Sequence, residues 1–110
     1  MAGYFQIFKG KSDFRFRLKA GNHEIILQSE GYAAKSGAKT GVASVQKNSP
    51  DDARYDRRES ASNYWFVLKA GNGEIIGKSE MYTTAAARDA GIESVKRNGP
   101  SDDVRDITEE

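Results

Sequence analysis

The chain has 110 residues, a net charge of +1 at pH 7, 37% hydrophobic and 30% charged residues, and no cysteine. This length supports one modest hydrophobic core, and the composition is typical of a folded globular domain rather than a disordered chain. The lack of cysteine excludes disulfides and thiolate chemistry, and the near-zero charge excludes a strong overall field toward nucleic acid or anionic lipid.

The first strand signals are a short β-rich run at residues 4–8 and a run at residues 14–19 that alternates apolar with basic side chains. Strict alternation is typical of a strand with one buried and one solvated face. It places the phenylalanines of the second run in the core, and Arg15, Arg17 and Lys19 on the opposite face.

A two-residue turn is predicted between this run and the next strand, which covers residues 24–30. Asn22 and His23 form the loop, and the type I′ turn favoured by such a loop needs φ > 0 at both positions. Histidine is enriched at positive φ, so we interpret His23 as a turn residue rather than a metal ligand or a catalytic base. The register that follows pairs Ala20 with Ile25, Leu18 with Leu27, and Arg15 with Glu30.

Small apolar side chains recur at three- to four-residue spacing over residues 35–48, which predicts a helix with a narrow apolar stripe. Glycine inside a helix costs about 1 kcal/mol relative to alanine. We therefore expect Gly41, and Gly91 in the second copy described next, to mark close contact between helix backbone and sheet.

The chain then repeats itself. Residues 11–50 align without gaps on residues 61–100, and 18 of the 40 aligned pairs are identical. Two copies of one small unit, each with too little apolar surface for its own core, are expected to share one. We therefore divide the chain into a first repeat at 1–52 and a second at 53–110, packed as one compact domain.

The second copy differs from the first in informative places. Residues 53–58 stand in the position of the first strand and are far more polar, which predicts an edge strand. The second helix follows the potential caps Thr83 and Thr84 and ends at Asn-Gly-Pro, which predicts a left-handed cap at Gly99. A last short strand is expected over residues 104–107.

Three motifs stand out in combination: the doubled Leu-Lys-Ala-x-Asn-Gly-Glu-Ile-Ile, the Ser-Glu-x-Tyr that follows it, and the Gly-[Val/Ile]-x-Ser-Val helix segment. Together they resemble the YegP-like family of small uncharacterised bacterial proteins. The resemblance spans essentially the whole chain, with one departure at His23, where the family pattern has glycine. It implies a tandem repeat of a domain of unknown function in a bacterial cytosolic protein, and no activity or catalytic residue that could be carried over.

The expected fold is α+β. Two β-β-β-α repeats are related by a pseudo-twofold axis, and their antiparallel strands form a continuous or paired sheet covered by two helices.

We expect a non-catalytic binding or structural module rather than an enzyme, because no nucleophile–base pair, metal-ligand set or cofactor loop stands in the sequence. The first candidate interaction surface is Trp65 and Val67, which replace Arg15 and Arg17 of the first copy and make their strand apolar on both faces. Either the strand near Tyr55 or the C-terminal segment covers Trp65, or Trp65 is exposed to a protein partner.

The alternative is a nucleic-acid-binding protein that uses the basic face of Arg15, Arg17 and Lys19. It is less favoured, because alternation removes the aromatic residues of that strand from this face and the net charge is near zero. No apolar run approaches the roughly 18 residues of a membrane span, and the chain start lacks signal-peptide features, so we expect a cytoplasmic protein without a membrane partner. The identity of any ligand stays open.

Overall fold

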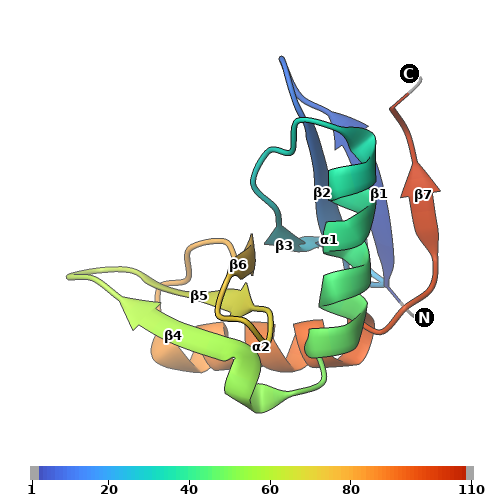
Figure 1. Cartoon of the computed structure of the whole chain (residues 1–110). Helices are drawn as coiled ribbons and strands as arrows, with labels where there is room; N and C mark the ends of the chain where they lie inside the picture. The colour runs from blue at the N-terminus through green and yellow to red at the C-terminus, as the bar shows by residue number, and fades with distance from the viewer. Residues whose placement is uncertain (1–2, 109–110) are drawn as a thin grey trace.

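The computed structural model describes residues 3–108, which form one seven-stranded sheet and two α-helices (Figure 1). The α+β class and the tandem arrangement are therefore confirmed. The elements in chain order are β1 (Tyr4–Lys9), β2 (Phe14–Lys19), β3 (Ile25–Gln28), α1 (Lys35–Asn48), a 3-10 turn (Asp52–Arg54), β4 (Tyr55–Glu59), β5 (Tyr64–Lys69), β6 (Ile75–Lys78), α2 (Ala85–Asn98) and β7 (Val104–Asp106).

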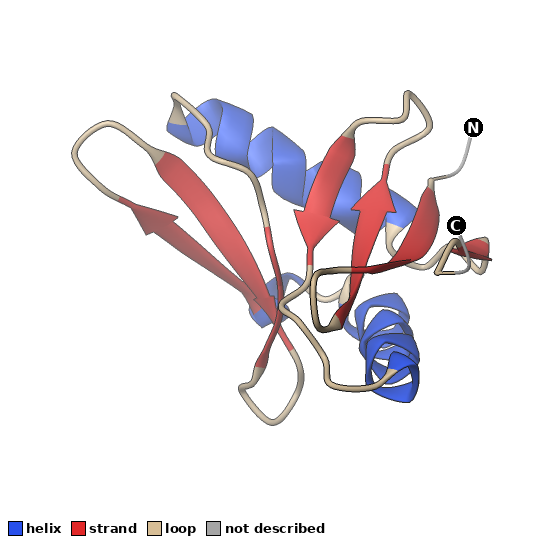
Figure 2. Cartoon of the chain, turned by 90° about the horizontal axis from the view of Figure 1, so that it is seen from above, coloured by secondary structure: helices blue, strands red, loops and turns tan. Residues whose placement is uncertain are grey.

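The sheet is continuous across both repeats, in the order β4-β5-β6-β3-β2-β1-β7. All neighbours are antiparallel except β1 and β7. The repeats join at the centre, where β3 and β6 pair only through Gln28 and Lys78. Figure 2 shows the strands of the two repeats splaying apart on either side of this seam.

One core lies between the sheet and the two helices. Phe16 and Leu18 of β2 and their counterparts Phe66 and Leu68 of β5 are all fully buried in it. The helices contribute smaller side chains, as their narrow apolar stripes predict; these are Ala38, Val42 and Val45 from α1, and Ile92 and Val95 from α2.

The predicted close approach of the helices is confirmed at Gly41 and Gly91. A Cβ atom on Gly41 would lie 2.6 Å from a ring carbon of Phe16 and 2.6 Å from the hydroxyl of Tyr32. A Cβ atom on Gly91 would lie 2.5 Å from the hydroxyl of Tyr82. Each glycine therefore lets a tyrosine hydroxyl and the helix backbone meet.

The predicted two-residue type I′ turn is wrong. The His23 N–H donates to the Ala20 carbonyl, and the Ala20 N–H donates to the Glu24 carbonyl, each at 2.9 Å. Among the described residues, positive φ occurs only at His23 (69°) and at its counterpart Gly73 (87°). These features define a three-residue loop whose last residue is left-handed and forms a bulge. His23 is thus a turn residue, as expected, but in a different turn.

The bulge shifts part of the predicted register. Leu18 does pair with Leu27, but Lys19 rather than Ala20 pairs with Ile25, because the extra loop residue is absorbed there. Arg17 pairs with Gln28 in the register predicted for Arg15 and Glu30, but the ladder ends at Gln28, and the Arg15 guanidinium contacts Asp13 at 3.1 Å.

The second helix begins as predicted, with the Thr84 hydroxyl accepting a hydrogen bond from the Ala87 N–H at 3.0 Å. The left-handed cap predicted at Gly99 is wrong, because this residue has a right-handed φ of −61°. The glycine is needed there for space rather than for φ, since a Cβ atom on it would clash with Ser49.

The two strands that could have covered Trp65 are the edge strands of the sheet. β4 is an edge strand, as predicted, and pairs with β5. The expected C-terminal strand is β7, which pairs in parallel with β1 at the other edge; the Ile107 N–H donates to the Ile7 carbonyl at 2.9 Å. Neither strand therefore folds across the face that carries Trp65.

Candidate functional site

The sheet has a second face, directed away from the core and the helices, which we call the outer face. Its residues alternate with the buried ones along each strand. They are Tyr4, Gln6 and Phe8 of β1; Arg15, Arg17 and Lys19 of β2; Gln28 of β3; Asp56 and Arg58 of β4; Trp65, Val67 and Lys69 of β5; Lys78 of β6; and Arg105 of β7.

The pairing register places one row of these residues across the whole sheet, with one residue from each strand. The cations of the row stand on every second strand, which are β7, β2 and β6. Beyond β6 the row continues with an apolar residue on β5 and ends with an acidic residue on β4. In order it runs Arg105, Gln6, Arg17, Gln28, Lys78, Val67, Asp56.

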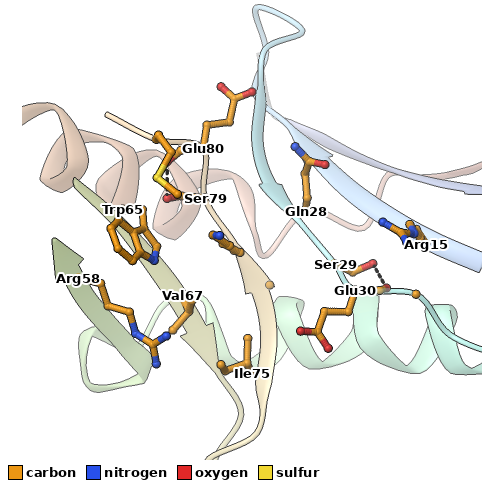
Figure 3. Close-up of a pocket in the computed structure, with 14 residues that line it drawn as sticks. Arg15, Gln28, Ser29, Glu30, Arg58, Trp65, Val67, Ile75, Ser79 and Glu80 are labelled. Carbon is orange, nitrogen blue, oxygen red and sulfur yellow. Dashed lines mark hydrogen bonds between the residues drawn. The ribbon is translucent and has the colours of Figure 1, made fainter. Parts of the chain in front are cut away.

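A cleft of about 660 Å³ opens on the outer face at the seam, because β3 and β6 diverge on either side of their one residue pair (Figure 3). This volume lies within the usual range for ligand sites. The two walls come from different repeats and differ in chemistry. The first repeat supplies a polar wall of Arg15, Gln28, Ser29 and Glu30. The second repeat supplies all the large apolar side chains of the cleft, together with polar ones; these are Trp65, Val67, Ile75 and Met81, and Arg58, Lys78, Ser79 and Glu80.

Trp65 is half-buried and lines the wall that the second repeat supplies. Arg58 is its cross-strand neighbour on β4, and the Lys78 ammonium lies 5.9 Å from the centre of its indole. The indole is therefore partly open to the cleft and flanked by two cations, a geometry suited to a planar or anionic ligand.

Val67 does not fit the predicted exposed surface. Its side chain is 3% exposed and lies outside the core cluster, so it is buried on the outer face. In register it stands between Lys78 and Asp56, whose side chains share this face, and the long aliphatic stem of a lysine covers apolar surface. Val67 thus forms the floor of the cleft.

The sequence did not indicate Ile75 and Met81, which are 41% and 51% exposed beside Trp65. The two residues line the same cleft as Trp65. Their one sequence signal is the loss of symmetry at Met81, where the first copy has Gly31.

The predicted basic face exists, and its cations have neighbours that the sequence did not reveal. Arg17 donates from Nε to the Gln6 amide oxygen at 2.8 Å, and its guanidinium lies 4.5 Å from the centre of the Phe8 ring. Arg105 lies 3.8 Å from the centre of the Tyr4 ring. Aromatic residues therefore do lie on this face, but they come from β1 and not from β2.

Three arginines of the outer face are paired with an aspartate two residues earlier in the chain. The pairs are Arg15 with Asp13, Arg58 with Asp56 and Arg105 with Asp103, at 3.1, 3.0 and 3.1 Å. Hydrogen bonds from the arginines hold the pKa of Asp56 and of Asp103 below the usual carboxyl range.

The nucleophile-type side chains near the cleft are already engaged. The Ser29 hydroxyl accepts from the Phe16 N–H and donates to the Glu30 carbonyl, at 2.9 and 2.8 Å. Ser79 makes the equivalent pair of bonds in the second repeat. His23 is bonded through Nδ1 to the Tyr4 hydroxyl at 2.7 Å and does not line the cleft.

Within residues 3–108, no group of three or more histidine or acidic side chains is arranged to hold a metal ion. No helix in the same range is long and apolar enough to cross a membrane.

The fold and its internal symmetry define a tandem-repeat α+β protein, and comparison with known proteins identifies the family. The model of the family described as Domain of unknown function (DUF1508) matches residues 11–56 and again residues 59–106. The chain therefore belongs to this family, and the resemblance to YegP-like proteins is confirmed.

Relatives of this chain are matched over different shares of their own length. A protein of Stutzerimonas stutzeri described as "UPF0339 protein in ptx operon 5'region" is 56% identical over 64 residues, which are 57% of this chain and 58% of that protein. A UPF0339 protein of Treponema denticola is 57% identical over 54 residues, 48% of this chain and 93% of that protein. The alignments thus span little more than half of the first curated relative and nearly all of the second.

The solution NMR structure of yegP from E. coli, described as a protein of unknown function, is 49% identical and superposes with a TM-score of 0.93 over 100% of this chain and 97% of that one. The comparisons confirm the fold and an uncharacterised family, and they assign no activity.

Proposed function

We propose that the chain is a non-catalytic binding module of the bacterial cytoplasm whose ligand site is the cleft around Trp65. The supporting observation is where the apolar side chains gather. In the described part of the chain, three large apolar residues are exposed; Ile75 and Met81 line this cleft, and Val104 does not. Exposed apolar groups gathered in one concave place beside a tryptophan are typical of a binding site.

The difference between the two walls supports binding of one asymmetric ligand. An ancestral pair of identical repeats would present the same residue at both walls, whereas here Arg15 stands where the other wall has Trp65. A ligand seated across the seam therefore contacts only polar side chains on one side, and a tryptophan with other apolar and charged side chains on the other.

The non-catalytic role is supported by the hydroxyls of Ser29 and Ser79, whose lone pairs and protons are held by backbone groups. A serine nucleophile needs an adjacent base, and the structure places none against either hydroxyl in the residues it describes.

The test uses the single tryptophan of the chain, which gives one indole N–H signal in an NMR spectrum. The ¹⁵N-labelled full chain is titrated with bacterial extract separated into small-molecule, nucleic-acid and protein fractions. We expect one fraction to shift the signals of Trp65, Ile75 and Met81, and not those of the exposed helix residues Lys39 and Arg97. Trp65→Arg, which copies the first repeat, should remove the response. Shifts confined to the helices, or no shift with any fraction, would exclude the cleft as the ligand site.

A further inference from the structure

We propose that the ligand of the outer face is single-stranded nucleic acid, with a base in the Trp65 cleft and phosphates along the row of cations. This inference rests on the proposed binding function and names the ligand class.

Charge is distributed unevenly over the molecule. The strand positions of the outer face carry one carboxylate, that of Asp56, and the cations of Arg15, Arg17, Lys19, Arg58, Lys69, Lys78 and Arg105. The whole chain has a net charge of +1. Clustering of basic residues on one sheet face is the electrostatic pattern of nucleic-acid binding, and the near-neutral total conceals it.

Acidic groups also border this face, and their carboxylates compete with the phosphates of the ligand for the cations. Asp13, Asp103, Glu30 and Glu80 lie in the flanking segments, and the aspartates hold Arg15 and Arg105. These ion pairs are solvent-exposed, with 48% and 25% of the side chains of Arg15 and Asp13 accessible, and 48% of each in the Arg105–Asp103 pair. Exposed ion pairs contribute little to stability, whereas a phosphate accepts two parallel hydrogen bonds from a guanidinium. A phosphate of the ligand can therefore replace the aspartate as the partner of each arginine.

The cations of the central row have the spacing of a track rather than of a single anion site. Arg105, Arg17 and Lys78 lie on alternate strands, which places them roughly 10 Å apart, since adjacent strands are separated by about 4.8 Å. The structure shows no carboxylate bound to Arg17 or Lys78 within residues 3–108. The row leads directly to the cleft, because Lys78 belongs to both.

The cleft suits an unstacked base. The half-buried indole of Trp65 offers a flat surface, and the amide of Gln28 stands on the opposite wall with a donor and an acceptor. A base in a duplex is already stacked and paired, so only single-stranded nucleic acid can place one there without opening a helix. A regularly charged polymer also fits a repeated cation track better than an acidic peptide, whose carboxylates have no fixed spacing.

The test measures binding of fluorescent oligothymidylate and oligoadenylate of about 12 nucleotides, within the usual site size of small single-strand-binding folds. Fluorescence anisotropy at several salt concentrations is read together with quenching of Trp65. We expect log K to fall linearly with log salt, by about 0.7 per phosphate contact. Arg17→Gln with Lys78→Gln should lower this slope by about 1.4, because two contacts are lost.

The matched control is Lys39→Gln with Arg97→Gln, which removes two exposed cations from the helices and should change neither affinity nor slope. Trp65→Ala should weaken binding roughly tenfold at unchanged slope, and Trp65→Phe should restore most of the loss, because stacking and not charge is altered. Circular dichroism verifies that each variant is folded.

Three results would overturn the assignment: equal losses in the face and control pairs, tighter binding of a duplex of the same length, or equal binding of polyglutamate. If oligonucleotides fail while the extract titration still shifts the Trp65 indole, the ligand class is wrong and the binding site stands. If neither experiment perturbs the indole, both proposals fall.

Discussion

Ser49 and Gly99 occupy the same position after α1 and α2, and they are in contact: a Cβ atom on Gly99 would overlap both Oγ and Cβ of Ser49. Ser49 is fully buried, and its hydroxyl has no hydrogen-bond partner in the described residues. Where equivalent residues meet at a pseudo-twofold axis, there is room for one side chain. One copy therefore carries serine and the other glycine.

This contact predicts a rescue by exchange. Gly99→Ser should destabilise the fold by about 1–3 kcal/mol through overpacking. Adding Ser49→Gly should bring the free energy of unfolding back to within about 1 kcal/mol of the wild type, because the exchange restores one side chain at the axis. Urea unfolding measures both. Gly71→Ala is the control, since its nearest neighbour would be 3.7 Å away. Additive losses in the double variant would contradict the shared contact.

The second prediction concerns the separated repeat. Residues 1–52 alone should be unfolded, or should dimerise to rebuild the core, because the core cluster takes its large side chains from both repeats and α1 also contacts β5 and β6. Sedimentation velocity and circular dichroism of the fragment decide, and a folded monomer would show that one repeat is self-sufficient.

The fold was largely predictable because its signals are local. Alternation located β2 and small-residue spacing located α1. The Leu18–Leu27 pair was predicted by counting from a two-residue turn, and it is present because the bulge compensates for the longer loop. The turn was mispredicted because an Asn-Gly pair fits both two-residue and three-residue loops, and hydrogen bonds of Ala20 decide between them.

The site was only partly predictable because it forms at the seam. Trp65 stood out as the residue that breaks the repeat symmetry. The burial of Val67 depends on its neighbours across the sheet, and the cleft depends on how β3 meets β6, where the ladder has one residue pair. The aromatic partners of Arg17 and Arg105 likewise come from pairing with β1.

The third prediction isolates backbone strain from packing. Gly73 has a φ of 87°, and a Cβ atom on it would have no heavy atom within 4 Å, so Gly73→Ala should cost about 1 kcal/mol through conformation alone. His23→Gly should change the free energy of unfolding by less, because two effects oppose each other. Glycine relieves the backbone strain at a φ of 69°, and the variant loses the hydrogen bond to Tyr4, which contributes about 1 kcal/mol. Thermal and urea unfolding compare the two with Gly71→Ala. Equal stability of Gly73→Ala and the wild type would indicate that the loop relaxes.

The last prediction concerns acid release of β7. Hydrogen bonds from the side chain and backbone of Thr108, and then from Lys35, hold the pKa of Asp106 well below its ordinary value of 3.8. A carboxyl with a lowered folded-state pKa stabilises the fold above the ordinary value, and this contribution is lost as the pH falls through the folded-state value. The Lys35–Asp106 pair, at 3.0 Å, ties β7 to α1, so acidification below about pH 4 should loosen β7 first.

Hydrogen exchange of the Ile107 amide reports this step, because its N–H donates to the Ile7 carbonyl in the β1–β7 ladder. We expect its protection to fall on acidification while that of Leu18 in the core persists. Asp106→Asn should lower Ile107 protection at neutral pH and remove most of the acid dependence. Asp102→Asn makes the same charge change at an exposed position of this segment and should leave both intact. An identical response of the two variants would mean that net charge, and not the Asp106 contacts, holds β7 in place.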